Sequence, residues 1–321
     1  MGLSETDSVG SSNESRTGEE TRTSTVPVYD DRFRRYGRLR YPLDDQQSDQ
    51  ENKIPAWSRT KLQTPRWKVN LNLFKSLIAK NLPSIDKQGR SPAHQAAADK
   101  HEEIEREVQQ ALSDGYGPVV EGFNVTITKN DIRTLRPGEW LNDEVINFYG
   151  NLIMARSNAS SALPKVHVFS TFFYKTLSEN GYDKVRRWTK KTNIFAKDYL
   201  LIPIHCSGNH WTSAVVDMSK KKISYYDSLL GNNPKCFLTL RNYLESESRD
   251  KLKRPFDFQG WENECPKNIP RQQNGFDCGV FTCSFIESKS RGEDTFDFSQ
   301  ADMSYLRQKM VLDIVNKMLV E

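Results

Sequence analysis

The uneven distribution of apolar residues is the feature that most limits how this chain folds. The opening third is dominated by Ser, Thr, Arg, Asp, Glu and Gln, as in GSSNESRTGEETRTS over residues 10–24. Segments this polar cannot bury enough apolar surface to offset the entropy of ordering the backbone. From Gly122 onward, apolar runs and tryptophans occur at the density of a compact domain. We therefore expect a disordered tail over 1–65, a helical linker over 66–115 and a folded domain over 116–321.

Composition excludes several classes of protein. Lys and Arg number 46 against 42 Asp and Glu, a net charge of only +4. The basic stretch 30–40, DDRFRRYGRLR, is interrupted by acids and tyrosine, so we interpret it as solvated rather than as a nuclear address or a nucleic-acid contact. Five cysteines without CxxC spacing, following no signal peptide, are typical of free thiols in a reducing compartment. No apolar run approaches the roughly 20 residues that span a bilayer, so we expect a soluble protein.

Two segments between the tail and the domain have helical character. VNLNLFKSLIAKNL, residues 69–82, places apolar residues at helical intervals and predicts a short amphipathic helix, a candidate for docking a partner. Residues 86–104 resemble part of an ankyrin repeat, because SPAHQA stands where such repeats read TPLHxA. A lone repeat cannot bury its face and no second copy is visible. We favour a helix over about residues 91–112.

Hydrophobic periodicity within the domain predicts both helices and strands. NDEVINFYGNLIMA carries an apolar helical stripe behind an Asn or Asp N-cap, whereas DYLLIPIH is the continuous apolar run of a buried strand. Near the C-terminus, helical spacing places Leu306, Met310, Ile314 and Met318 on one face. The order of elements lacks the regular alternation of a doubly wound sheet, so we predict an α+β fold. The expected helices span 142–155, 235–247, 278–288 and 304–319, and the expected strands span 125–127, 198–205, 210–218 and 221–228.

A cysteine stands where a polar turn meets a helical segment. In QQNGFDCGVFTCSFIE, a glycine-containing turn leads directly to Cys278. A thiol at a helix N-terminus feels the positive end of the helix dipole, which favours the thiolate, and the first helical N–H groups can bind an oxyanion. Gly279 would let a substrate approach closely. The competing interpretation is that Cys278 is a small buried hydrophobe. The turn alone leaves both interpretations open.

Two of the five histidines, His205 and His210, lie at the ends of strand-like segments in the domain. His210 begins a strand beside a Ser-Gly-Asn turn, whereas His205 ends the preceding strand, where a lone histidine is more often a core or rim residue. If the two strands after His205 pair as a hairpin, their far ends meet and bring Asp227 close to His210. Asp217 would then lie at the turn. The hairpin therefore favours Asp227 as the group that orients the imidazole.

Five blocks of the sequence, in one order, resemble a known family. They are GEWLNDEVINFY, RRWTKKTNIFAKDYLLIPIH, GNHWTSAVVDM, ISYYDSL and PRQQNGFDCGVF. Over about residues 120–320 they resemble the ubiquitin-like-protein proteases (the Ulp, or sentrin-specific, family), and within it the SUMO-specific branch. The resemblance implies a papain-like cysteine protease fold, with a mixed sheet flanked by helices. It also implies an isopeptidase that cuts after the C-terminal Gly-Gly of SUMO, maturing SUMO precursors and releasing SUMO from lysines.

The resemblance also assigns catalytic roles to individual residues. It implies that Cys278 is the nucleophile, His210 the general base and acid, and Asp227 the residue that orients the imidazole. Gln272 matches the family glutamine that donates a hydrogen bond to the oxyanion. The adjacent Gln273 is its rival, because an arginine stands where the family pattern often has its first glutamine.

Four further positions match substrate-binding residues of the family. Trp140 and Trp211 match the tryptophans that close a narrow tunnel over the glycine pair of the substrate; without the resemblance they would be interpreted as core aromatics. Asp143 and Arg187 match positions that contact the SUMO surface in relatives. The CSGNHW turn is one residue longer than usual in the family, a departure at the rim of the tunnel.

Three alternative functions compete with this interpretation. A protease of the same fold could act on another ubiquitin-like modifier such as NEDD8, although RRWTKK and WLND favour SUMO by resemblance. A non-catalytic SUMO-binding module would be expected to have lost Cys278 or His210, and both are present. An acetyltransferase built on the same constellation would need an acetyl-CoA site, and the sequence shows no basic cofactor pocket.

The remaining cysteines, Cys206, Cys236, Cys265 and Cys283, lack metal-ligand spacing with the histidines, so we predict no zinc site and no other cofactor. Cys283 lies five residues along the helix from Cys278 and should pack in the core. We expect a monomer without membrane insertion or nucleic-acid binding, whose partners are SUMO, its precursor and sumoylated proteins. The resemblance implies the nucleus or nuclear envelope, with the cytoplasm as the alternative.

Overall fold

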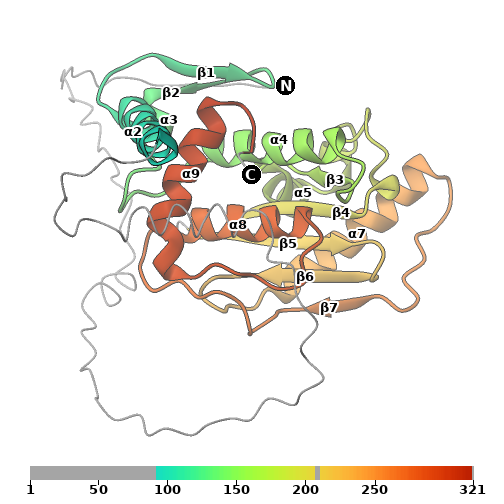
Figure 1. Ribbon diagram of the computed structural model, residues 1–321. Coiled ribbons are helices and arrows are strands. Elements are labelled where there is room, and N and C mark those ends of the chain that lie inside the picture. The colour runs from blue at the N-terminus through green and yellow to red at the C-terminus, as the bar shows by residue number, and fades with distance from the viewer. Residues whose placement is uncertain (1–91, 207–209, 320–321) are drawn as a thin grey trace, which may run out of the picture.

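A computed structural model describes residues 92–206 and 210–319. The tail predicted over 1–65, the basic stretch 30–40 and the helix predicted over 69–82 lie outside the described residues. Figure 1 shows helices packed around a twisted sheet, with a separate hairpin beside helix α2. The described helices are α2 (Pro92–Leu112), α3 (Lys129–Arg133), α4 (Asp143–Ala159), α5 (Phe172–Asn180), α6 (Tyr182–Val185), α7 (Pro234–Lys251), α8 (Cys278–Ser290) and α9 (Met303–Val315), with short 3₁₀ turns η3 (Ile194–Ala196) and η4 (Gln300–Asp302).

The central sheet has five strands in the order β3-β4-β5-β6-β7. Strand β4 pairs in parallel with β3 and antiparallel with β5, β5 pairs antiparallel with β6, and β6 pairs in parallel with β7. The mixed sheet and its helices confirm the predicted α+β class. The described strands are β1 (Pro118–Gly122), β2 (Val125–Thr128), β3 (Val166–Val168), β4 (Tyr199–Cys206), β5 (His210–Asp217), β6 (Lys222–Tyr226) and β7 (Glu262–Glu264).

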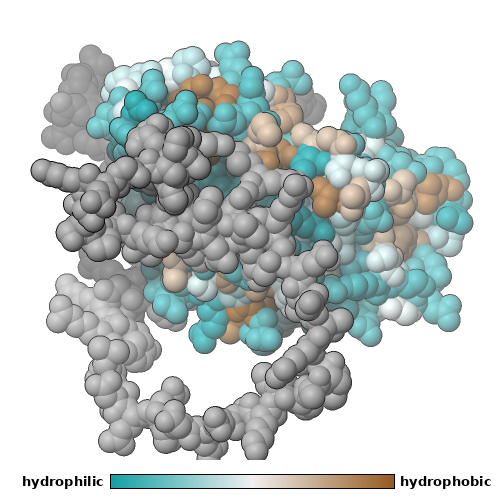
Figure 2. Space-filling view, viewed as in Figure 1, coloured by the Kyte–Doolittle hydropathy of each residue, from teal (hydrophilic) through white to brown (hydrophobic). Residues whose placement is uncertain are grey.

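Helices cover both faces of the sheet, which explains why its central strands are apolar on both sides. Leu201 and Val215 face one core, which they share with residues of α4, α8 and α9. Leu200 and Ala214 face a second core, which they share with residues of α5 and α7. Both faces of β4 and β5 are therefore buried, and a run such as DYLLIPIH has no polar alternation. On the described part of the face in Figure 2, hydrophobic patches are small and separated by hydrophilic residues.

Helix α2 is one continuous helix, as the sequence predicted, whereas an ankyrin repeat would divide the segment into a turn and two helices. Its C-terminal carbonyls are bound by cations from the folded domain. Lys129 Nζ donates to the carbonyl of Ala111 at 3.1 Å, and Arg136 Nε donates to the carbonyl of Leu112 at 3.1 Å. Positive charge at a helix C-terminus is favourable, so these contacts fix the end of α2 to the domain.

The buried face of α9 differs from the predicted stripe. Met310 and Ile314 are buried as expected, but Leu306 is only partly buried, and Met318, which is 60% exposed, lies beyond Val315, where α9 ends. The buried face is instead centred on a neighbouring set of positions and includes charged side chains. Its members are Met303, Arg307, Met310, Val311, Asp313 and Ile314.

Candidate active site

The hairpin of β5 and β6 brings a histidine and a carboxylate together. The two strands pair from Asp217 and Lys222 at the turn to Ser213 and Tyr226 near the open end. His210 begins β5 and the carboxylate follows directly after Tyr226, so both side chains lie at the open end. His210 Nε2 lies 2.7 Å from Oδ1 of that carboxylate, Asp227.

Asp217 lies at the opposite end of the hairpin from His210. Its Oδ1 accepts hydrogen bonds from the backbone N–H groups of Ser219 and Lys220, at 3.1 and 2.8 Å. Its carboxylate therefore shapes the turn between the strands, and only Asp227 is placed to bind the imidazole.

Asp227 is held as a charged acceptor. Its side chain is nearly buried, and its two oxygens accept hydrogen bonds from the backbone N–H groups of Leu229 and Gly231, at 2.8 and 3.2 Å. Burial alone raises the pKa of Asp227, but the hydrogen bond and charge of His210, together with these N–H groups, outweigh burial and hold the pKa below its usual value. A carboxylate only accepts hydrogen bonds, so His210 Nε2 is the donor.

His210 also interacts with Cys278, the first residue of α8. Asp227 occupies Nε2, so Nδ1 is the ring nitrogen that remains to face the sulfur. Burial lowers the pKa of His210, but the hydrogen bonds and charges of Asp227 and Cys278 outweigh burial and raise the pKa of His210 from 6.5 to about 10. At neutral pH the imidazole is therefore protonated, and an imidazolium beside a cysteine is an arrangement suited to nucleophilic catalysis.

The space beside Gly279, where the sequence suggested that a substrate approaches, is filled by side chains of the protein itself. A Cβ added to Gly279 would meet Leu141 Cβ at 2.7 Å and Trp211 Cδ1 at 3.4 Å. The indole Nε1 of Trp211 in turn donates to the carbonyl of Leu141 at 3.0 Å. The glycine therefore lets the start of α8 pack directly against the segment that follows Trp140.

The two rival glutamines differ in environment. Gln272 is nearly buried, whereas the side chain of Gln273 is exposed. The Nε2 of Gln272 donates to the carbonyl of Asn274 at 2.7 Å, and its Oε1 accepts from Ser228 Oγ at 2.8 Å. A carbonyl can only accept, so the contact with Asn274 fixes which end of the amide carries the nitrogen. Of the two, only Gln272 has its amide inside the protein.

Both candidate tunnel tryptophans adjoin Leu141, Trp140 in the chain and Trp211 through a hydrogen bond. Trp211 is buried on β5, and the ring of His205 lies against it with centroids 4.6 Å apart. Burial and the charge of Lys175 lower the pKa of His205, so this second histidine carries little charge at neutral pH. Trp140 is partly buried and directly precedes Leu141, the residue that Trp211 binds.

The two candidate surface contacts lie outside this cluster. Asp143 is the first residue of α4 and is partly buried, but the N-cap is Asn142, whose Oδ1 accepts from the N–H of Val145 at 3.0 Å. Arg187 is exposed in the segment after α6, beside Trp188, which is 43% exposed. The structure does not bring Arg187 to the cluster of His210, Asp227 and Cys278.

Comparison with known proteins shows which family the chain belongs to. Residues 139–320 match the model of the Ulp1 protease family, C-terminal catalytic domain. The chain belongs to the Ulp1 protease family. The resemblance seen in the five sequence blocks is thereby confirmed.

Relatives of this Ulp1-family chain are named sentrin-specific proteases. The chain is 50% identical to a sentrin-specific protease of Caenorhabditis elegans over 201 residues, which cover 63% of this chain and 29% of that protein. It is 41% identical to sentrin-specific protease 2 of Homo sapiens over 225 residues, covering 68% and 37%. The chain thus spans about a third of the length of these relatives.

Solved structures of the family share the fold of this chain. One is the C-terminal Ulp1 protease domain in complex with Smt3, the yeast ortholog of SUMO. It is 29% identical with a TM-score of 0.60, and the match covers 75% of this chain and 100% of that one. Another is the SUMO protease Ulp1 with its catalytic cysteine oxidised to a sulfonic acid, which is 32% identical with a TM-score of 0.57 over 68% and 97% of the two chains. These matches confirm the predicted Ulp-type fold.

Several residues of the site in this Ulp1-family chain escaped sequence reasoning. Ser228 binds the amide of Gln272, and Arg307 on α9 forms a buried ion pair with Asp277. Ser228 directly follows the candidate Asp227 in the chain, and Asp277 directly precedes the candidate Cys278. Adjacency is a signal that could have identified them, whereas Arg307 carries no such signal.

The remaining cysteines lie apart from the site. Cys283 is fully buried, and burial raises the pKa of its thiol far above the usual value. Cys206 lies on the rim of the second core, with its Sγ 3.5 Å from the hydroxyl of Tyr225. Within residues 92–206 and 210–319, no three His, Cys, Asp or Glu side chains are grouped as metal ligands would be. Among the helices in that same part of the chain, none is long and apolar enough to cross a membrane.

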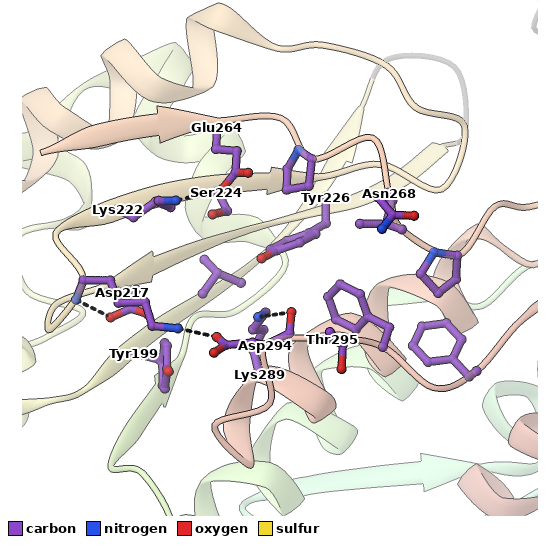
Figure 3. A pocket seen from close by; sticks show the side chains of 17 residues that line it. Tyr199, Asp217, Lys222, Ser224, Tyr226, Glu264, Asn268, Lys289, Asp294 and Thr295 are labelled. Carbon is purple, nitrogen blue, oxygen red and sulfur yellow. Dashed lines mark hydrogen bonds and ion pairs between the residues drawn. The ribbon is translucent and has the colours of Figure 1, made fainter. Parts of the chain in front are cut away.

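A cavity of about 500 Å³ lies at the turn end of the β5–β6 hairpin, where Asp217 and Lys222 line it. Figure 3 shows Lys289 and the ring of Tyr226 projecting into it. Lys222 and Glu264, which also line the cavity, form an ion pair with Nζ and Oε2 3.2 Å apart. His210 and Cys278 do not line this cavity. It is therefore separate from the candidate active site.

Proposed function

We propose that this chain is a cysteine protease that cleaves after the C-terminal Gly-Gly of SUMO, maturing SUMO precursors and removing SUMO from lysines. The observation that carries the proposal is the arrangement at the open end of the hairpin. His210 Nε2 lies 2.7 Å from Asp227 Oδ1, and the hydrogen bonds and charges of Asp227 and Cys278 together raise the pKa of this imidazole. SUMO as the modifier is supported by relatives named sentrin-specific proteases and by the Ulp1 domain solved in complex with Smt3.

In the proposed mechanism, Cys278 thiolate attacks the carbonyl carbon of the last glycine. The carbonyl π electrons move to oxygen, and the oxyanion accepts hydrogen bonds from the N–H of Cys278 and from the amide of Gln272. His210 gives its proton to the departing amine, either the ε-amine of a lysine or the α-amine of a precursor tail. The C–N bond then breaks and leaves a thioester.

In the second step, hydrolysis of the thioester, His210 changes from general acid to general base. His210, now neutral, removes a proton from water, and the hydroxide attacks the same carbonyl carbon. The C–S bond breaks, the thiolate returns, and the imidazolium is restored. Asp227 holds the imidazole in one orientation through both steps and stabilises its charge.

Glycine specificity is assigned to the tryptophans. Trp140 and Trp211 would roof the groove that leads to Cys278 and leave no room for a Cβ on the last two residues. The hydrogen bond from Trp211 to Leu141 and the tight packing at Gly279 support a rigid roof. The exposed Arg187 and the helix-start residue Asp143 would contact the folded body of SUMO, whose affinity would then select the modifier.

We further propose that the protein acts as a monomer in the nucleus or at the nuclear envelope, as the family resemblance implies. The segments that precede α2 would then serve localisation or docking rather than catalysis. Fusing residues 1–91 and residues 92–321 separately to a fluorescent protein tests this division and leaves α2, whose Val108 and Ala111 belong to the core, with the domain. A tail that does not enrich at the nucleus on its own contradicts it.

Turnover of fluorogenic substrates tests the function. The purified chain and its Cys278→Ser variant are compared on SUMO, NEDD8 and ubiquitin, each carrying a coumarin amide at its C-terminal glycine. We expect cleavage of the SUMO substrate with a kcat/KM at least about 100-fold above the other two and none by the variant. Preference for NEDD8 would keep the mechanism and overturn the choice of modifier. No cleavage of any substrate would overturn the proposed activity.

A further inference from the structure

The buried side chain of Arg307 connects two parts of the candidate active site that are far apart in sequence. Its side chain on α9 and that of Asp277, the residue before Cys278, are each 3% exposed. Arg307 Nε and Nη2 lie 2.9 and 2.7 Å from Asp277 Oδ1. We propose that Arg307 is a positioning residue: through Asp277 and through the loop 134–139, it holds the start of α8 and the segment leading to Trp140 in their catalytic arrangement.

The loop side of this contact is made entirely by backbone carbonyls. Arg307 Nη1 donates to the carbonyls of Thr134 and Arg136, both at 3.0 Å, and Nη2 donates to the carbonyl of Glu139 at 2.7 Å. These residues lie between α3 and Trp140, outside any helix or strand. Buried backbone carbonyls in such a loop need hydrogen-bond donors, and here a single guanidinium donates to three carbonyls. The path of the loop therefore depends on Arg307.

The other side of the contact reaches the turn before the nucleophile. Asp277 Oδ2 accepts from Asn274 Nδ2 at 2.6 Å and from Gln300 Nε2 at 2.8 Å, and Arg307 Nη2 also donates to the carbonyl of Phe276 at 3.2 Å. The carbonyl of Asn274 in turn accepts from the amide of Gln272. The same network therefore connects the candidate oxyanion donor with the start of α8.

Charge gives the arginine a second role. A buried carboxylate directly before Cys278 would repel negative charge on the sulfur if it were not neutralised. Arg307 places its cation on Asp277 Oδ1 and neutralises it. Replacing Arg307 with lysine keeps the cation but removes the planar fork of five donors, so this replacement isolates the positioning role from the charge.

Arg156→Lys is a matched control for Arg307→Lys. Arg156 on α4 also binds α8, but at the opposite end of the helix. Its Nη1 lies 2.7 Å from Glu287 Oε1, its Nη2 lies 2.7 Å from Ser290 Oγ, and both charged side chains are mostly buried. Each variant therefore loses an arginine fork that binds α8, and only one of the forks adjoins the nucleophile.

The test compares the two variants in the full chain. Since the geometry of attack is affected more than substrate binding, we expect Arg307→Lys to lower kcat roughly 10- to 100-fold with KM changed by less than about threefold. Hydrogen exchange should become faster in peptides covering 134–141 and 276–281. Arg156→Lys should leave kcat within about threefold of wild type and leave exchange in these peptides unchanged. Equal kcat and equal exchange in the two variants would overturn the inference.

The inference rests on the proposed function, and the two fail in different ways. Failure of the wild-type chain to cleave any substrate would refute the function, while the exchange comparison would still test the network. If Arg307→Lys does not fold, Gln300→Ala removes one donor to Asp277, together with the acceptor of the Gln273 N–H, from a partly exposed position. It should lower kcat roughly 3- to 10-fold and speed exchange in 276–281. Wild-type kcat and exchange in Gln300→Ala would then overturn the inference.

Discussion

Replacing Gly279 with alanine tests whether the start of α8 is held against the tryptophan segment. The added Cβ would lie 2.7 Å from Leu141 Cβ, well inside van der Waals contact, and 3.4 Å from Trp211 Cδ1. Overpacking of this kind costs about 1–3 kcal/mol, and the better helix propensity of alanine returns at most about 1 kcal/mol. We therefore expect Gly279→Ala to lower the free energy of unfolding by about 1–2 kcal/mol.

Catalysis should suffer more than stability. Leu141 is fixed by the indole of Trp211, so a shift of Leu141 moves the neighbourhood of both tryptophans. A displacement of this kind near the reacting groups lowers turnover by roughly 10- to 100-fold. Urea unfolding followed by tryptophan fluorescence gives the stability, and hydrolysis of the SUMO–coumarin substrate gives the turnover.

Gly275→Ala is the matched control. A Cβ at Gly275 meets no atom within 4 Å, and its backbone does not require positive φ. It should be as stable as wild type or more stable by up to about 1 kcal/mol, because alanine restricts the unfolded chain. If Gly279→Ala matched Gly275→Ala in both stability and turnover, the tight packing at the start of α8 would be refuted.

Three further predictions concern the hydrogen bonds of the site. In Cys278→Ser, NMR titration should give a lower pKa for His210 than in wild type, because the hydrogen bond and charge of Cys278 both raise it; an unchanged midpoint would contradict the contact. The pKa of His210 is raised in the folded protein from 6.5 to about 10, so its stabilising contribution is complete below pH 6.5 and lost as the pH rises through 10. The free energy of unfolding should therefore fall over this range by a larger amount in wild type than in Asp227→Asn; equal slopes would count against it. Ser228→Ala should lower kcat roughly 10-fold by freeing the amide of Gln272, but should have little further effect in a Gln272→Ala background; additive losses would show that the two act independently.

The main strands were predictable because burial on both faces leaves a clear pattern. β4 and β5 read as apolar runs, and their pairing with β6 follows from the short turn between them. The strands β3 and β7 were missed, because each has only three residues and their partners are distant in the chain. All three residues of β7 are exposed and polar, so no hydrophobic pattern marks it.

The hairpin β1–β2 was only half predicted, since the alternation in VTI identified β2 alone. Its turn residues, Phe123 and Asn124, both have positive φ, at 55° and 60°. Such turns usually contain Gly, Asn or Asp, and a bulky residue such as Phe is uncommon at the first position. The rings of Phe123 and Phe148 pack edge to face with their centroids 5.3 Å apart, a tertiary contact that no local pattern indicates.

The site divides in the same way between local and long-range contacts. Hairpin geometry was enough to bring His210 to Asp227, because both lie at the ends of adjacent strands. The choice between Gln272 and Gln273 needed burial, since two neighbouring glutamines in a loop look alike. Arg307 could not be found, because its partner Asp277 lies 30 residues away, and an arginine in an amphipathic helix is normally solvated.

The central claim is that Cys278, activated by His210, forms an acyl bond to the last glycine of SUMO. Its most direct test is intact-mass analysis of the full chain after reaction with SUMO that carries an electrophile at its C-terminus, followed by peptide mapping of the modified residue. The account predicts one adduct, mapped to Cys278 and absent from Cys278→Ser, with little labelling by the matching NEDD8 and ubiquitin probes. An adduct on another cysteine, or none at all with folded protein, would contradict it.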